Sequence, residues 1–265
     1  MSDKLPITCY IRTLNEERSI AAVIESVADF CSQIIVIDSG SNDQTIAIAR
    51  SLGAKVIEQP WLGNGFQKRV GEDLAEHDWL LDLDADELVS SELQSNIRSV
   101  FEMSETIPYD VFSLKLVTIT PIGVIWKHSC LAWRNKLYRK SIYRVPAHKA
   151  WDQFKIKDQK KLKKLDGDLY HHSFENFEHL IAKMNRVSSV RSREKRVPNT
   201  AVLVLRILFG FPIYFCKKYF YQRMFLTGIY GLVAAILMAA QRWFTDVKMY
   251  ENILIEREKN LSKKS

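Results

Sequence analysis

The sequence predicts an α/β protein with a largely parallel sheet, followed by an apolar helical extension. Short apolar runs alternate with amphipathic helical patterns over the first hundred residues, which is typical of a parallel sheet covered by helices on both faces. Beyond residue 199 the chain becomes apolar and aromatic. With 47% hydrophobic and 26% charged residues among 265, the composition excludes a wholly disordered chain. We therefore expect one domain over residues 1–198 and a helical tail over residues 199–265.

The predicted elements follow one another closely along the chain. Apolar runs predict strands at residues 7–11, 34–37, 54–57 and 79–83, and a strand-like run covers residues 109–120. Apolar residues at helical spacing predict helices at residues 20–28, 45–52, 66–75 and 174–193. The lysine-rich stretch 155–164 is expected to be a solvated loop or hairpin. Polar clusters at residues 13–16, 38–43 and 82–87 each follow a strand, so they should converge at the carboxyl edge of the sheet, where such folds bind ligands.

The strongest single feature is the acidic run Asp82, Asp84, Asp86 and Glu87 at the end of an apolar strand. Placing these carboxylates together is unfavourable unless a cation neutralises them. Their hard oxygens suit Mg²⁺ or Mn²⁺, which in turn binds a diphosphate. The alternative is a solvated acidic turn, but the position at the end of a buried strand favours the metal site.

The other polar clusters are ambiguous by themselves. Asp38 has the chemistry to accept hydrogen bonds from a ribose or a base edge, or to cap a turn, a role that Asp43 fits better. Asn15 has the chemistry to bind a ligand or only to cap its helix. The glycines of Gly63-Asn-Gly-Phe-Gln-Lys-Arg69 allow a tight backbone approach, and Lys68 or Arg69 offers a cation to a phosphate or base.

Charge divides the chain into two unlike parts. The net charge is +7, but residues 1–100 carry 8 basic and 17 acidic side chains, a net of −9, and the rest carries +16. A strongly basic part indicates an anionic partner. Cys9, Cys31, Cys130 and Cys216 lack the spacing of a zinc site or a disulfide framework, and the N-terminus lacks the apolar core of a signal peptide. We expect a cytoplasmic protein.

Three motifs, in order along the chain, carry a resemblance to a known family. Thr13-Leu-Asn-Glu-Glu17, Val36-Ile-Asp-Ser-Gly-Ser-Asn-Asp43 and Asp84-Ala-Asp-Glu87 each follow a predicted strand. The chain thereby resembles glycosyltransferase family 2, with the GT-A nucleotide-sugar-binding fold, and is most similar to bacterial lipopolysaccharide-core β-glucosyltransferases. The likeness extends over nearly the whole chain, through Asn135-Lys-Leu-Tyr-Arg139 and Gly167-Asp-Leu-Tyr-His171.

The resemblance implies roles for individual residues. It assigns seven residues to the nucleotide: Thr13, Asn15, Glu16, Asp38, Gln67, Lys68 and Asp84. Asp38 would meet the uracil or ribose. Asp84 and Asp86 are similar to the family's DXD pair, with Asp86 the expected direct ligand of Mg²⁺ or Mn²⁺.

The expected general base is where this chain departs from the family. Similar proteins have a Val-His-Glu segment, whereas this chain reads Val145-Pro-Ala-His-Lys149, so that Lys149 stands in place of the acid. Asp152 and His148 are the candidate catalytic residues, and His148 is also a candidate metal ligand. Asp152 is equally well interpreted as the partner of a nearby lysine. His171 matches a lone histidine of the family, with a structural or a catalytic role.

The tail is expected to associate with a membrane without spanning it. Residues 225–240 are apolar but fall short of the about 20 residues that cross a bilayer. Aromatic residues interleaved with Lys and Arg favour an interfacial helix or a shallow hairpin at the anionic cytoplasmic leaflet. A core helix or a dimer interface is the alternative.

These observations together predict an inverting glycosyltransferase. It would move a hexose, with glucose the expected sugar, from a UDP-sugar to a lipopolysaccharide-core or related saccharide–lipid acceptor, at the cytoplasmic face of the inner membrane. One alternative is transfer to a polyprenyl phosphate, and another is a non-catalytic membrane-bound binding protein on the same fold. No nucleic-acid partner is expected, because the aromatics lie in continuous apolar segments and not among exposed basic residues.

Overall fold

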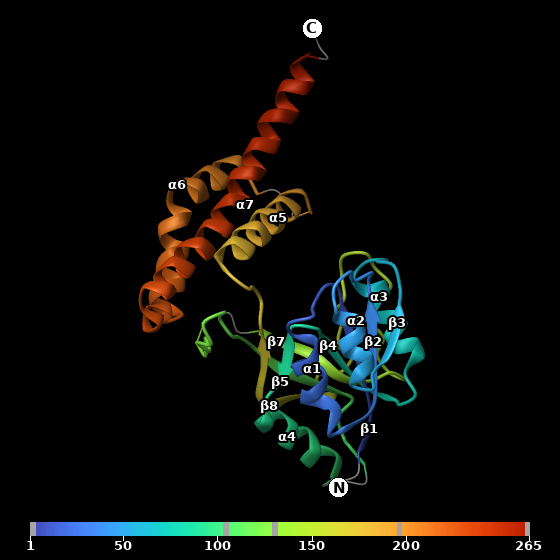
Figure 1. The fold of residues 1–265 in the computed structure, drawn as a ribbon. Helices are drawn as coiled ribbons and strands as arrows, with labels where there is room; N and C mark the ends of the chain where they lie inside the picture. The colour runs from blue at the N-terminus through green and yellow to red at the C-terminus, as the bar shows by residue number, and fades with distance from the viewer. Residues whose placement is uncertain (1–3, 103–105, 129–131, 195–197, 263–265) are drawn as a thin grey trace. The chain divides into compact units, whose positions relative to one another are not determined.

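The chain forms two compact units in a computed structural model that describes residues 4–102, 106–128, 132–194 and 198–262 (Figure 1). The first unit comprises Met1–Thr118 and Leu131–His172, and the second comprises Ile119–Cys130 and Ser173–Ser265. The first unit is therefore interrupted in sequence by a short segment of the second. The predicted tail boundary at residue 199 stays a prediction.

An eight-stranded mixed sheet forms the centre of the first unit. Its strands are β1 (Leu5–Thr13), β2 (Cys31–Asp38), β3 (Lys55–Glu58), β4 (Trp79–Asp84), β5 (Glu87–Val89), β6 (Val111–Thr118), β7 (Ala132–Arg139) and β8 (Leu162–His171). Their order is β3-β2-β1-β4-β7-β6-β8-β5. Strands β1 to β4 run parallel to one another, and β6 is parallel to β8, whereas β7 is antiparallel to both β4 and β6, and β5 is antiparallel to β8. The mostly parallel GT-A-like sheet is confirmed.

Four helices cover the two faces of this sheet (Figure 1). They are α1 (Ile20–Ala28), α2 (Thr45–Ser51), α3 (Asn64–Leu74) and α4 (Ser91–Glu102). Because side chains alternate along a strand, Ile7, Cys9 and Ile11 face one core with α1, α2 and α4, while Tyr10 faces a second core with α3 and the segment 143–156. The strands and helices predicted up to residue 83 are therefore confirmed.

Register places charged residues side by side at the carboxyl ends of the parallel strands. Arg12 of β1 lies opposite Asp84 of β4, and Thr13 lies opposite Asp38 of β2. The loops after β1, β2 and β4 consequently meet at one edge, as the sequence predicts.

The antiparallel part of the sheet was predicted only in part, since the strand-like run at residues 109–120 corresponds to β6. Strands β5 and β7 and helix α4 are absent from the expected elements, and Leu162–Lys164 open strand β8, so the loop interpretation of the lysine-rich stretch is wrong for these three residues. A short 3₁₀ turn at Gln159–Lys161 precedes them.

The second unit is helical, and its last helix is longer than the apolar run expected there from the sequence. It contains α5 (Phe177–Glu194), α6 (Thr200–Cys216), a π-helical turn η2 (Lys217–Tyr221), a 3₁₀ turn η3 (Met224–Thr227) and α7 (Gly228–Ser262). Trp126 from the inserted segment packs in its core with Phe174 and Met184. Helices α6 and α7 form a hairpin, since Trp243 Nε1 donates to the Ile207 carbonyl at 2.8 Å and Arg206 pairs with buried Asp246.

The helical stretches of this hairpin are longer than the apolar runs read from the sequence. The stretches 200–221 and 224–262 contain 22 and 39 residues, long and apolar enough to cross a membrane by length and composition. The expectation that the tail is too short to span is therefore wrong on the ground of length. Only 11% and 28% of their apolar windows are buried, which disfavours the alternative of core helices.

The thiols match the expectation of no disulfide framework where the structure describes them. Cys9, Cys31 and Cys216 are free cysteines, and Cys130 lies outside the described residues.

Candidate active site

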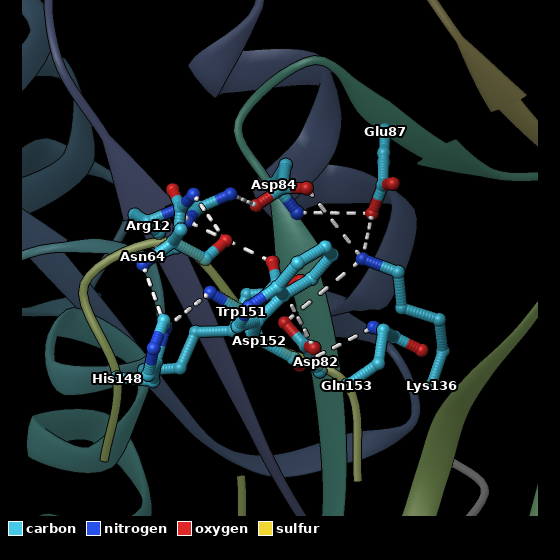
Figure 2. Close-up of polar contacts among 12 residues, drawn as sticks. Arg12, Asn64, Asp82, Asp84, Glu87, Lys136, His148, Trp151, Asp152 and Gln153 are labelled. Atoms are coloured by element: carbon cyan, nitrogen blue, oxygen red, sulfur yellow. Dashed lines mark hydrogen bonds and ion pairs between the residues drawn. The ribbon is translucent and has the colours of Figure 1, made fainter. Parts of the chain in front are cut away.

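Because side chains alternate along a strand, Asp82 and Asp84 of β4 lie on the same face of the sheet as Arg12 of β1. Arg12 Nη2 lies 2.7 Å from Asp84 Oδ1, and its Nη1 donates to Asn64 Oδ1 at 2.8 Å (Figure 2). Burial alone would raise the pKa of Asp84, but Lys136, Lys68 and Arg12 outweigh it and hold this pKa well below its usual range. Asp84 is thus a stable carboxylate at neutral pH.

Lys68 of α3 is a buried cation that joins the acidic strand to a distant loop. It is 1% exposed, and its Nζ lies 2.8 Å from Asp82 Oδ2 and 3.1 Å from Asp152 Oδ2. The sequence assigned Lys68 to the nucleotide. Its ammonium group pairs with two carboxylates, and its nucleotide-binding role stays a prediction.

Lys136 of β7 is a second buried cation, and the sequence analysis missed it. Its Nζ lies 2.7 Å from Glu87 Oε2 and 3.6 Å from Asp84 Oδ2 (Figure 2). Burial would lower the pKa of Lys136, but Asp82, Glu87 and Asp84 together raise it. A lysine within an apolar strand segment, Lys136-Leu-Tyr138, was the only signal in the sequence that this residue is special.

Asp86 lies beside His171. Residues Glu87 and His171 are opposite one another in the antiparallel pair of β5 and β8, which brings His171 Nε2 to 3.1 Å from Asp86 Oδ2. Each of these two side chains is 22% exposed. A carboxylate and an imidazole therefore face solvent together at the end of the acidic strand.

The structure uses Asp38 to shape its own loop. This carboxylate is fully buried and accepts hydrogen bonds from the amides of Gly40 and Ser41, both at 2.8 Å, and from the Ser41 hydroxyl. The turn-forming role that was assigned first to Asp43 therefore belongs to Asp38 as well. Asp43 accepts from the Thr45 amide at 3.0 Å at the start of α2.

The remaining predicted nucleotide residues lie on the same edge. Asn15 links two loops, because its Oδ1 accepts from the Asn42 amide at 2.9 Å, and Glu16 accepts from the Ser19 hydroxyl at 2.7 Å. Gln67 is buried and donates to the Gln59 carbonyl at 2.8 Å. Thr13 Oγ1 is buried and has no hydrogen-bond partner among the residues that the structure describes, whereas Asn15 is exposed. Their nucleotide-binding role stays a prediction.

The loop at residues 146–152 packs against the beginning of α3. The amides of Asn64 and Gly65 donate to the carbonyls of Lys149 and His148 at 2.8 and 2.9 Å. A Cβ on Gly65 would lie 2.0 Å from the Pro146 carbonyl oxygen. The tight approach that the glycines allow is therefore an approach of the chain's own loop.

Buried Glu72 holds the other end of this loop. Its Oε1 accepts from the Val145 amide at 2.8 Å and from the Tyr138 hydroxyl at 2.7 Å, and its Oε2 accepts from Arg144 Nε. No local pattern around Glu72 indicates this role. Glu72 and Gly65 thus fix the position of the two candidate bases.

The two candidate bases have different surroundings. Asp152 points into the cluster, with Oδ2 near Lys68 and 3.9 Å from Arg12 Nη1, and is 27% exposed (Figure 2). His148 is exposed, and its Nδ1 accepts from the amides of Ala150 and Trp151, both at 3.0 Å. A neutral His148 in this geometry carries its proton on Nε2 and donates there, so it is poorly placed to accept a proton. The structure brings Asp152, and not Lys149 or His148, to the acidic strand.

The charges of this cluster do not cancel. Five carboxylates, those of Asp82, Asp84, Asp86, Glu87 and Asp152, face three permanent cations, Arg12, Lys68 and Lys136. The formal excess is two negative charges, which a divalent cation would balance. Within the described part of the chain, no group of three or more His, Cys, Asp or Glu is arranged around a metal position. Of the predicted metal residues, Asp84 pairs with Arg12 and Asp86 lies beside His171, and their metal-binding role stays a prediction.

Comparison with known proteins also indicates a glycosyltransferase. The family model described as glycosyl transferase family 2 matches residues 8–155. A protein of Rickettsia felis named uncharacterized glycosyltransferase is 32% identical over 98% of this chain and 94% of its own length. The lipopolysaccharide core biosynthesis glycosyltransferase LpsC of Rhizobium meliloti is 24% identical over 98% of each chain.

Among solved structures, the similarity is more partial. Glucosyl-3-phosphoglycerate synthase from Mycobacterium tuberculosis, crystallised with Mn²⁺, UDP and its product, matches 43% of each chain with 22% identity and a TM-score of 0.33. A likeness of this extent carries no argument about the site of this chain.

Proposed function

The chain belongs to glycosyl transferase family 2, and we propose that it transfers a hexose, with inversion, from a UDP-sugar to a saccharide–lipid acceptor. The observation that supports this most directly is the placement of Asp84 and Asp152 around Arg12 and Lys68 at the carboxyl edge of the parallel strands, with Asp86 following on the same strand end beside His171. One cluster thereby offers donor-side carboxylates and a candidate base. Because the chain is a glycosyltransferase, a non-catalytic binding protein is set aside.

Asp86 and His171 fit a divalent metal. Their facing atoms lie 3.1 Å apart, close to the about 3 Å that separates neighbouring donors in an octahedral shell with bonds of 2.0–2.1 Å. Two protein ligands leave the other positions to water and to the diphosphate. A bound Mg²⁺ or Mn²⁺ stabilises the negative charge that develops on the leaving nucleoside diphosphate.

Asp152 is the proposed general base. The acceptor hydroxyl loses its proton to Asp152 as its oxygen attacks the anomeric carbon, and the bond from that carbon to the diphosphate oxygen breaks, which inverts the configuration. Lys68 and Arg12 engage Oδ2, so we assign proton acceptance to Oδ1. Arg12 keeps Asp84 in place beside this path.

The acceptor assignment rests on the relative LpsC, whose name places it in lipopolysaccharide core biosynthesis, and on the second unit. That unit exposes large apolar side chains on α6 and α7, among them Leu208 at 63% and Ile229 at 79%. Basic residues beside such a surface favour an anionic leaflet. We propose attachment to the cytoplasmic face of the inner membrane. In the first unit, the ring of Trp151 is 65% exposed and offers an apolar surface to a sugar beside Asp152.

A thermal-shift experiment tests the donor site. We expect UDP with Mn²⁺ to raise the melting temperature of the full chain, and we expect Asp86→Ala to abolish this rise. The matched control is Asp166→Ala, which removes an exposed carboxylate of the same unit and should leave the rise intact. A wild-type protein whose melting temperature does not respond would contradict the proposal.

Product analysis separates the two acceptor classes. Membrane extracts incubated with labelled UDP-glucose should yield a labelled lipid whose label survives the mild acid that cleaves a sugar–phosphate bond. Label released by that treatment would instead favour transfer to a polyprenyl phosphate.

A further inference from the structure

A cavity in the second unit is lined by an unusual concentration of positive charge. It has a volume of about 540 Å³ and is lined by α5, η2, α7 and the end of α6. Five of its thirteen lining residues are basic: Lys183, Arg191, Lys217, Lys218 and Arg242. None of the thirteen is acidic. Positive charges brought together repel one another, so this lining favours an anionic occupant.

Two of these cations are held in position by neighbouring groups. Lys183 Nζ donates to the Ser173 carbonyl at 2.7 Å, and Arg242 Nε donates to the Tyr214 hydroxyl at 3.3 Å. Neither contact neutralises the charge. The buried acid Asp246 pairs with Arg206, which does not line the cavity. The lining residues thus bring several cations together and include no carboxylate of their own.

The rest of the lining is apolar. Leu180 and Met184 are buried, and Val187 and Met238 complete a surface free of charge. Gln222 Oε1 is buried without a hydrogen-bond partner among the described residues, so it offers an acceptor to a ligand hydroxyl. A cavity with a basic part and an apolar part suits an amphiphile that carries a phosphate on an apolar chain.

We propose that this cavity binds the phosphomonoester headgroup of a lipid, with the first part of its acyl chains against the apolar surface. A phosphomonoester brings about −1.5 to −2 charges and three strong acceptor oxygens, which matches a lining that includes Lys183, Arg191, Lys217 and Arg242 better than the single charge of a phosphodiester. Basic pockets between apolar helices at the cytoplasmic side of a membrane are a recognised way to bind anionic headgroups. The natural source of such a lipid would be the membrane to which we propose that the protein attaches. This is the one point at which the inference rests on the proposed function.

Binding of a water-soluble lipid tests the cavity without a membrane. We expect the full chain to bind dihexanoyl phosphatidic acid, by titration calorimetry, about tenfold or more tightly than dihexanoyl phosphatidylcholine or glycerol 3-phosphate. The double variant Arg191→Gln/Lys217→Gln should lose this preference. The matched control Arg193→Gln/Lys259→Gln removes two charges from the same unit outside the cavity and should keep it.

A second variant tests the apolar part without changing charge. Val187→Trp should weaken binding of the short-chain phosphatidic acid, while its UDP and Mn²⁺ response, which reports on the first unit, stays as in wild type. Equal affinity for all three probes, equal losses in the cavity and control variants, or displacement of the lipid by equimolar glycerol 3-phosphate would overturn the proposal. None of these results depends on transferase activity, so they are distinguishable from failure of the proposed function.

Discussion

The side chains of Asp152 and His148 lie on one loop but differ in how well they are placed to accept a proton. Lys68 orients Asp152 toward the cluster, whereas backbone amides occupy the only acceptor nitrogen of a neutral His148. We expect Asp152→Asn to lower kcat by about 100-fold or more, as for loss of a general base. His148→Ala should lower it by less than about tenfold.

Both variants should keep the thermal response to UDP with Mn²⁺, because neither side chain belongs to the pair Asp86 and His171. Steady-state rates with a fixed donor and a membrane extract as acceptor are the measurement. Full activity in Asp152→Asn would remove it from the role of base.

Lys136 is expected to stabilise the fold as well as the site. Its removal leaves Glu87 buried without its cation, whereas Asp82 keeps Lys68, and losing one partner of a buried ion pair costs about 3–5 kcal/mol. Urea unfolding of Lys136→Met should show a loss of this size. Lys115→Met breaks a more exposed pair with Asp168, at 33% and 18% exposure, and should cost about 1 kcal/mol or less. Similar losses in the two variants would contradict this distinction.

The sequence predicted the carboxylates of the candidate site more completely than its cations. Asp84 and Asp86 stand out because they follow an apolar strand, and the local chain determines their position. Lys136 lies about fifty residues later, and its role depends on a strand pairing between β4 and β7 that no local pattern reveals. Asp38 shows the converse, since its residue type fits a ligand and a turn equally; the structure shows its hydrogen bonds within the loop, and its nucleotide-binding role stays a prediction.

At the scale of elements, the beginning of α3 and the loop 146–152 depend on each other. A methyl group on Gly65 would lie 2.0 Å from the Pro146 carbonyl oxygen, so Gly65→Ala must displace the loop that carries Asp152. A displacement of about 1 Å can cost about 100-fold in rate, and we expect a loss of that order in kcat. The UDP and Mn²⁺ response should persist, because Asp86 and His171 lie outside α3.

Gly53→Ala is the control for this variant. Gly53 has a φ of +79° and no atom within 4 Å of an added Cβ, so alanine there strains the backbone without touching the loop. It should lower stability and leave kcat unchanged. A Gly65→Ala enzyme with the wild-type kcat would show that the loop position is not critical.

Helix α2 offers a pH-dependent contribution to stability. Burial would raise the pKa of Asp43, but hydrogen bonds from Thr45 and from the Glu17 amide outweigh it and lower this pKa. The contribution is therefore present above the unfolded value of about 3.9 and is lost as the pH falls through the lower native value. Asp43→Ala should destabilise the protein by about 1 kcal/mol at neutral pH, and the difference from wild type in urea unfolding should shrink below about pH 4. A difference that is constant with pH would contradict this interpretation.

Elements with a strong local pattern were predicted, and those defined by partners were not. The helices at residues 20–28 and 45–52 show apolar spacing by themselves. Strand β7 has an alternation broken by buried Lys136, and strand β5 has only three residues, so both depend on neighbours far along the chain. The tail helices continue past their apolar runs because packing between α6 and α7 accommodates polar residues such as Asp246 and Arg206.

For the whole molecule, the unequal charge of the sequence has a structural counterpart. The acidic first hundred residues supply four of the five carboxylates of the candidate site, all but Asp152, while the basic remainder includes the cavity of the second unit. The net charge of +7 is thus a sum over an acidic part and a basic part of the chain.

Membrane association is the prediction that belongs to this scale. Leu208→Glu/Phe209→Glu places charges on an exposed apolar surface, where the two side chains are 63% and 57% exposed. We expect this variant to lose co-sedimentation with anionic vesicles. Leu52→Glu, at a 36% exposed site in the first unit, should sediment as wild type. Unchanged sedimentation of the double variant would remove α6 from the attachment surface.

The two units are interleaved in sequence, since Ile119–Cys130 belongs to the second unit although the chain on either side of it belongs to the first. Trp126 in this insert belongs to the same buried core as Met224 and Ala234 of the tail, so deletion of the tail alone would remove part of the core around the insert. The tail is consequently not a portable module. A chimaera that exchanges membrane attachment between relatives has to carry residues 119–130 together with residues 173–262. For the same reason, we expect the two segments to evolve together.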